Sequence, residues 1–224
     1  MTTDLNPGDP NLGDPNPGDP GPGDPGPGDP LPGDPNPGDP LPVETGVWIV
    51  VLGELCLFTL FFATYLYYRA LSPELFEASS ATLRRDLGAF NTLVLLASSW
   101  CVACAAKTLH TAVGRRQAVS YLAGAFGLGI VFVVVKVFEY KGAITGGVNV
   151  LTDDFYMFYF MLTGIHLLHL LVALALLAVL IQHLRSALVN DDTVSDELVG
   201  FTSCFWHMID IVWIILFPLL YLLH

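Results

Sequence analysis

The chain has 224 residues, of which 53% are hydrophobic and only 13% charged, and its mean hydropathy is +0.58. A water-soluble domain of this length would not normally reach such values, so lipid is the expected solvent. The formal net charge of -12 comes mainly from one end, because residues 1–46 hold nine of the 21 acidic residues and no Lys or Arg. The rest of the chain is nearly neutral and gives no sign of nucleic-acid binding.

Residues 1–46 form a tail rich in proline, glycine and aspartate, with fourteen of the sixteen prolines of the chain. Between residues 6 and 40 a five-residue unit ending in GDP is repeated seven times. Proline removes backbone donors, glycine adds chain entropy and the aspartates repel one another, so the tail is predicted to be disordered. It is interpreted as a solvated spacer, with an acidic docking arm for a basic partner as the alternative.

The remaining residues, 47–224, are predicted to form an all-α integral membrane domain. Five apolar segments are each long enough, at about 1.5 Å per residue, to cross a hydrocarbon core of roughly 30 Å. We place these spans at residues 47–68, 89–110, 119–141, 155–184 and 199–223. The connections are short and polar, as at Ser72-Pro73, so we expect an antiparallel bundle of five transmembrane helices. Lys and Arg are shared equally between the two sets of loops, four against four, and do not fix the orientation.

Seven ionisable residues lie within the apolar segments, where an unpaired charge costs several kcal/mol and marks a candidate functional site. They are Glu54, Lys136, Glu139, His166, His169, His207 and Asp210. Six of them form pairs three residues apart, which places each pair on one helix face. By helical rise, the three histidines and Asp210 fall in the middle third of the membrane and could meet in one polar cluster.

Three interpretations of these residues are open. The first is a buried hydrogen-bonded network, with His207 oriented by Asp210 and with Lys136 and Glu139 neutralising each other. The second is a metal or proton-relay site that includes Glu54, and the third is haem ligation by His169 and His207. We favour the network, and therefore expect no catalytic centre, no metal and no bound cofactor. An autonomous haem or metal protein and a small proton-coupled transporter remain the alternatives.

Two other residue classes are given structural interpretations. The four cysteines, Cys56, Cys101, Cys104 and Cys204, all fall in apolar segments and are expected to pack rather than to form disulfides. The aromatic run of residues 155–160 is expected to face lipid, or alternatively another subunit.

Four stretches resemble the subunit III family of haem-copper oxidases. They are Gly53-Glu54-Leu55, the segment Lys136–Tyr140, the TGxHxxH pattern at residues 163–169 and the WHxxDxxW pattern at residues 206–213. The resemblance runs from about residue 46 to the C-terminus. The five-helix length is similar to that of accessory proteins of nitric oxide reductase.

This resemblance implies a subunit without haem or copper that packs beside a catalytic haem-copper subunit and contacts membrane lipids. Its role would be to support assembly, stability and proton uptake of an oxidase or a nitric oxide reductase. Glu54 would be the family's buried carboxylate, and His166, His169, His207 and Asp210 would form its polar core. The resemblance also implies a bacterial-type plasma membrane location with the N-terminus in the cytoplasm.

Overall fold

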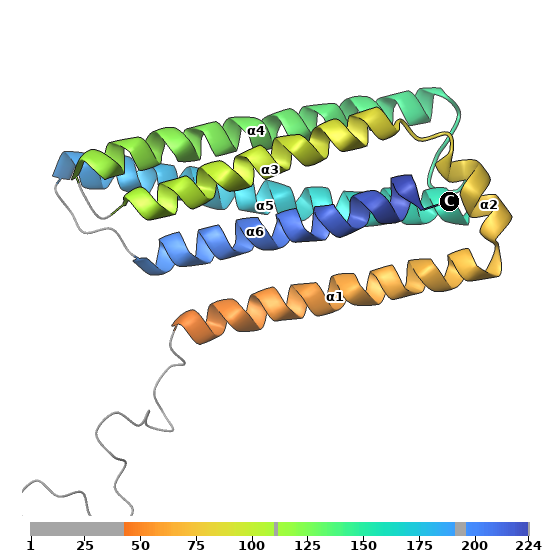
Figure 1. Ribbon diagram of the computed structural model, residues 1–224, viewed down its shortest axis with the longest axis horizontal. Coiled ribbons are helices and arrows are strands. Elements are labelled where there is room, and N and C mark those ends of the chain that lie inside the picture. The colour runs from red at the N-terminus through yellow and green to blue at the C-terminus, as the bar shows by residue number, and fades with distance from the viewer. Residues whose placement is uncertain (1–42, 110–111, 191–195, 224) are drawn as a thin grey trace, which may run out of the picture. The chain divides into compact units, whose positions relative to one another are not determined.

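The computed structural model describes residues 43–109, 112–190 and 196–223, and these residues form helices joined by short turns (Figure 1). The repeat tail and the segment around Asp191 lie outside the described residues. The helices are α1 (Val43–Leu71), α2 (Pro73–Ser80), α3 (Arg85–Thr108), α4 (Ala112–Thr145), α5 (Asp154–Asn190), α6 (Asp196–Phe217) and the π-helix η1 (Pro218–Leu222).

Five of these helices, α1 and α3–α6, are long and apolar enough to cross a membrane, which confirms the predicted fold class. The helices α4 and α5 have 34 and 37 residues, well above the roughly 20 that a span requires. They extend beyond the predicted spans because helical structure continues into polar residues that hydropathy does not count.

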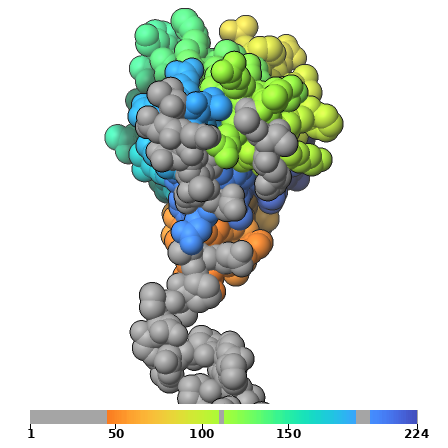
Figure 2. Space-filling view, turned by 90° about the vertical axis from the view of Figure 1, so that its left-hand side faces the viewer, coloured from red at the N-terminus to blue at the C-terminus, as the bar shows by residue number. Residues whose placement is uncertain are grey.

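The spanning helices alternate in direction, as expected of an antiparallel bundle. In Figure 1, α1, α4 and α6 run one way and α3 and α5 run the other, so α6 ends opposite the end at which α1 begins. The helix α1 lies at one edge, as seen end-on in Figure 2. Only 11% of the most apolar part of α1 is buried within the bundle, against 61% for α6, so most of the α1 surface is not covered by the rest of the described chain.

The expectation of a short polar connection after the first span was incomplete. The residues after Ser72 form the two-turn helix α2, with Pro73 in its first turn, where a missing N–H costs nothing. Phe76 of α2 is buried, with its ring 5.5 Å from that of Tyr65 and 5.7 Å from that of Phe155. The single apolar side chain of Phe76 therefore docks α2 between α1 and α5. A hydropathy profile does not detect a helix this short.

The turn after α4 depends on a glycine. Gly147 has a φ of 87°, and the N–H of Val148 bonds the carbonyl of Ala143 while that of Gly147 bonds the carbonyl of Ile144. This is the Schellman arrangement that ends many helices, and it requires a left-handed residue after the cap. It reverses the chain between α4 and α5.

The end of α6 is shaped by Pro218, which begins the π-helix η1. The carbonyl of Leu219 accepts a hydrogen bond of 3.2 Å from the Tyr65 hydroxyl of α1. Gly88 of α3 allows close approach here, because a Cβ at this position would lie 2.7 Å from the ring of Phe217. These contacts place the last turn of the chain, including Tyr221, inside the bundle.

Candidate functional site

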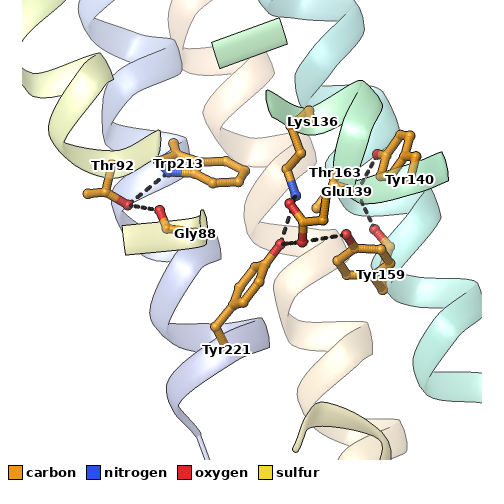
Figure 3. A network of polar contacts seen from close by, with 9 residues as sticks. All are labelled: Gly88, Thr92, Lys136, Glu139, Tyr140, Tyr159, Thr163, Trp213 and Tyr221. Atoms are coloured by element: carbon orange, nitrogen blue, oxygen red, sulfur yellow. Dashed lines mark hydrogen bonds and ion pairs between the residues drawn. The ribbon is translucent and has the colours of Figure 1, made fainter. Parts of the chain in front are cut away.

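The most connected polar group in the described helices surrounds Lys136 and Glu139 of α4 (Figure 3), and we call it the Lys136 cluster. It consists of Lys136, Glu139, Tyr140, Tyr159, Trp213 and Tyr221. The Lys136 ammonium lies 3.0 Å from Glu139 Oε2 and donates a hydrogen bond of 2.7 Å to the Tyr221 hydroxyl. Lys136 is 1% exposed and Glu139 is 7% exposed, so the ion pair is removed from both water and lipid.

The carboxylate of Glu139 accepts three hydrogen bonds. Its Oε1 accepts from the hydroxyl of Tyr159, at 2.8 Å, and from that of Tyr221, while Oε2 accepts from Lys136. An ionised carboxylate only accepts hydrogen bonds, so three donors aimed at it fit the charged form. The pair is thus neutral as a whole and internally satisfied, which is the condition under which charges are tolerated at membrane depth.

Aromatic rings surround the ammonium group of Lys136. The ring centroids of Trp213, Tyr159, Tyr221 and Tyr140 lie 5.0, 5.1, 5.3 and 5.7 Å from Nζ. A cation within about 6 Å of a ring face is attracted by the ring quadrupole, more strongly where water is absent. The rings therefore replace part of the hydration that the ammonium gives up.

The tyrosines of this cluster were missed as polar partners in the sequence. Tyr159 belongs to the aromatic run of residues 155–160, whose expected lipid-facing position is wrong for most of its members. Phe155, Tyr156, Phe158 and Tyr159 are buried, since this part of α5 packs against α2 and α4 as well as α1. Tyr159 lies one turn before Thr163, which hydrogen-bonds the hydroxyl of Tyr140. Only the fold shows that Tyr221, 85 residues after Lys136, completes the cluster.

A second polar contact joins α1 to α5. The Nε2 atom of His169 lies 3.0 Å from Glu54 Oε2, and its Nδ1 atom lies 2.8 Å from the carbonyl of Ile165. A carbonyl only accepts, so Nδ1 carries a proton and Nε2 faces the carboxyl group. The side chains of His169 and Glu54 are 17% and 31% exposed, so this pair borders the surface of the bundle.

A third contact joins α6 to α3. The Nδ1 atom of His207 lies 2.7 Å from Ser99 Oγ but 4.0 Å from Asp210 Oδ2, beyond hydrogen-bond distance. The expectation that Asp210 orients His207 is therefore corrected, because a serine on the antiparallel neighbour α3 approaches the ring more closely. Asp210 is 4% exposed and its carboxyl group also lies near the Ser99 hydroxyl, but neither carboxyl oxygen has a partner with full hydrogen-bond geometry among the described residues.

His166 has apolar surroundings. It is 1% exposed, with its ring 5.1 Å from that of Trp213 and 5.7 Å from that of Phe132. Neither ring nitrogen has a hydrogen-bond partner in the described part of the chain. It packs against the same tryptophan that faces Lys136, and Trp213 itself donates a 3.0 Å hydrogen bond to Thr92.

The expected single cluster of three histidines and Asp210 is thus divided among different helix contacts. His169 faces α1, His207 faces α3, and His166 packs on rings of α4 and α6. Similar depth in the membrane does not bring these side chains together, because residues on different faces of a helix point to different neighbouring helices. His169 and His207 therefore have different hydrogen-bond partners on different helices.

No group of three His, Cys, Asp or Glu residues among the described residues is arranged to hold a metal ion. The four cysteines are free thiols, with Cys56 exposed and the others partly buried. The described arrangement of polar groups links helices to one another.

Comparison with known proteins agrees with this all-helical membrane arrangement. Residues 40–224 match the family described as cytochrome c oxidase subunit III. Subunit 3 of the cytochrome bo(3) ubiquinol oxidase of Pseudomonas aeruginosa is 29% identical over 186 residues, which cover 80% of this chain and 83% of that protein. Cytochrome c oxidase subunit 3 of Thermostichus vulcanus is 28% identical over 179 residues, covering 80% and 86%.

A third relative differs in organisation. The heme-copper oxidase subunit I+III of Aeropyrum pernix is 25% identical over 189 residues, which cover 80% of this chain but 22% of that protein. With most of the chain matched, this is a multi-pass membrane protein of the haem-copper oxidase subunit III class. The chain belongs to the cytochrome c oxidase subunit III family. Its function is that of a non-catalytic subunit of a respiratory haem-copper oxidase.

Proposed function

We propose that this protein packs beside the catalytic subunit of a haem-copper oxidase and supports its assembly, stability and proton uptake. The observation that supports this partner is the Aeropyrum pernix relative, whose name joins subunits I and III. Its similarity to this chain covers 22% of the length of that relative. Two subunits fused in one protein are tethered to each other in the same membrane, which favours their association. The same proximity is proposed here for two separate chains.

The polar contacts of the bundle support a role in holding helices rather than in binding a cofactor. The Lys136 cluster joins α4, α5 and η1, and the other two contacts join α1 to α5 and α3 to α6. Such contacts fix the relative positions of helices that have no hydrophobic driving force for association in lipid. A rigid accessory subunit would offer its partner a preformed surface.

We further propose a bacterial-type plasma membrane location with the N-terminus in the cytoplasm. An odd number of spans places the two ends of the chain on opposite sides, and the acidic tail then lies in the cytoplasm. The relatives named above are subunits of both quinol and cytochrome c oxidases. Either electron donor is compatible with this chain.

The test is affinity purification of the tagged chain from its native membranes in a mild detergent. Visible spectroscopy and mass spectrometry of the eluate would identify the partner, and oxidation of quinol or of ferrocytochrome c would identify the donor. A co-purifying haem-bearing oxidase subunit, with no Soret band on the separated chain, is the expected result. Co-purification of a nitric oxide reductase would instead make this chain an accessory subunit of that enzyme. A chain that purifies alone with its own haem would overturn the proposal.

A further inference from the structure

A cavity of about 520 Å³ opens beside the Lys136 cluster, at the end of the bundle where α4 ends and α5 begins. Two members of that cluster, Glu139 and Tyr159, form part of its wall. Residues of the α2–α3 turn, the last turns of α4 and the start of α5 form the rest, among them Thr82, Arg84, Phe138, Gly142 and Tyr156. A water molecule occupies about 30 Å³ in the liquid, so the cavity has room for on the order of ten.

The inner wall of the cavity has hydrogen-bonding capacity that the described residues leave unfilled. A carboxylate offers about four acceptor positions, and three of those on Glu139 are taken by the donors described above. The Tyr159 hydroxyl donates to Glu139 and can still accept a hydrogen bond. Both residues are buried and both line the cavity, so the cavity is where a further small donor could reach them.

The outer wall of the cavity is polar and lies at the edge of the membrane span. Thr82 and Arg84 precede α3 and are exposed. On α4, Gly142 lies three residues before the span ends at Thr145. Phe138 is one turn deeper, roughly 10 Å inside the span at about 1.5 Å per residue. The cavity therefore extends from the aqueous boundary to the buried ion pair.

We propose that this cavity is an aqueous vestibule, which brings water from the α2 end of the bundle to the Glu139 carboxylate. Water supplies the donors that Glu139 and Tyr159 can still accept, and it hydrates the guanidinium group of Arg84 at the entrance. Hydrocarbon would supply no donor and would lie beside an ion pair whose charges are costly at membrane depth. The vestibule does not depend on the identity of the partner subunit.

Neighbouring residues of α4 provide matched positions for a test. Phe138 lines the cavity, whereas Val137 does not. Both are exposed and lie at nearly the same depth in the span, so a cysteine at either position should leave the fold unchanged. Gly142 and Gly127 form a second pair, since a Cβ at either position meets no atom within 4 Å and only Gly142 lines the cavity. Gly142→Leu is therefore expected to obstruct the vestibule, and Gly127→Leu is its control.

The experiment measures thiol labelling of the full chain in lipid nanodiscs, with its four native cysteines replaced by alanine. The probe is the cationic, membrane-impermeant reagent 2-(trimethylammonium)ethyl methanethiosulfonate, and the mass of the intact chain reports its attachment. The reagent is dissolved in water and reacts with the thiolate, so Phe138→Cys should label at least about tenfold faster than Val137→Cys. Gly142→Leu should remove this advantage when it is combined with Phe138→Cys, and Gly127→Leu should preserve it.

An anionic probe, 2-sulfonatoethyl methanethiosulfonate, locates the entrance of the vestibule. It has to pass Arg84, so Arg84→Ala should lower the ratio of anionic to cationic labelling at Phe138→Cys by about two- to fivefold, the effect of one nearby charge in water. The neighbouring exposed Arg85 does not line the cavity, and Arg85→Ala should leave the ratio unchanged. Equal labelling of Phe138→Cys and Val137→Cys, equal labelling with Gly142→Leu and Gly127→Leu, or a ratio unaffected by Arg84→Ala would each overturn the proposal.

Discussion

Lys136 and Glu139 lie one turn apart on α4, with their charged groups 3.0 Å from each other and both side chains almost fully buried. The spacing of three residues lets one helix carry both charges and neutralise them locally. The hydroxyl of Tyr221 in η1 forms hydrogen bonds with both members of the pair, so two charged residues of α4 are satisfied by a side chain from another helix.

Replacement of one member of this pair should be more damaging than replacement of both. Lys136→Met leaves the Glu139 carboxylate buried without its counter-charge and should destabilise the purified chain by about 3–5 kcal/mol. The double variant Lys136→Met/Glu139→Gln carries no charge and should recover a large part of this loss. Thermal unfolding in detergent measures both, with Lys141→Met, an exposed lysine of the same helix, as the control. A double variant less stable than both singles would contradict this account.

The hydroxyl of Tyr221 should contribute measurably to stability. Tyr221→Phe removes the donor to Glu139 and the acceptor for Lys136 while keeping the ring, so we expect a loss of about 1–3 kcal/mol. Tyr121 is exposed on α4, and Tyr121→Phe should leave the thermal midpoint unchanged. Equal shifts for the two variants would mean that the hydrogen bonds of Tyr221 contribute nothing beyond ring packing.

Ser99 and Asp210 should respond in opposite ways. Ser99→Ala removes the 2.7 Å contact of His207 and should cost about 0.5–1.5 kcal/mol. Asp210→Leu removes a buried carboxyl group that has no hydrogen-bond partner among the described residues, so the stability of the separated chain should be unchanged or higher. Thermal unfolding of the two variants gives the comparison. A larger loss in Asp210→Leu than in Ser99→Ala would return Asp210 to the role of partner to His207.

Glu54 and His169 should be energetically coupled across α1 and α5. A double-mutant cycle with Glu54→Gln and His169→Gln should give an interaction energy of about 0.5–3 kcal/mol in unfolding experiments. The cycle that pairs Glu54→Gln with His207→Gln is the control, because His207 bonds Ser99 instead. That control should be additive within about 0.5 kcal/mol. Additivity in both cycles would show that the 3.0 Å contact contributes no net coupling.

Deletion of residues 5–41 should leave membrane insertion and complex recovery intact. The family match begins at residue 40, the last residue of the repeat, so almost all of the repeat lies outside the matched part of the chain. Membrane levels of the tagged protein and co-purification of its partner measure the outcome. Loss of the partner on deletion would favour the acidic docking arm over the spacer.

Hydropathy was sufficient to predict the five spanning helices, because each span contains at least as many apolar residues as a membrane crossing requires. The i, i+3 spacing was likewise sufficient for the Lys136–Glu139 pair, since both residues belong to one helix. It failed for His207 and Asp210, where the same spacing predicted a direct hydrogen bond. The competing partner, Ser99, is 108 residues away in the sequence, and no local pattern encodes the approach of α3 to α6.

Tyr159 and Tyr221 also show that the sequence does not reveal which polar partners a side chain meets. In the sequence, Tyr159 stands in an aromatic run and Tyr221 near the C-terminus, both ordinary positions for residues at a membrane boundary. The fold turns both hydroxyls onto one carboxylate. Depth along a helix can be counted from the sequence, but the direction in which a side chain points depends on which helix packs beside it.

The position of Tyr221 also sets an order of events during biosynthesis. A chain is made from its N-terminus, so α4 leaves the ribosome with Lys136 and Glu139 long before residue 221 is translated. Until then the pair has only its own mutual attraction and any contacts from α5, and η1 later supplies the hydroxyl that bonds both charges. A chain truncated before Tyr221 would lack this hydroxyl, and its charged pair would remain incompletely bonded. Translation through Tyr221 therefore completes the hydrogen bonding of the charged pair, 85 residues after Lys136.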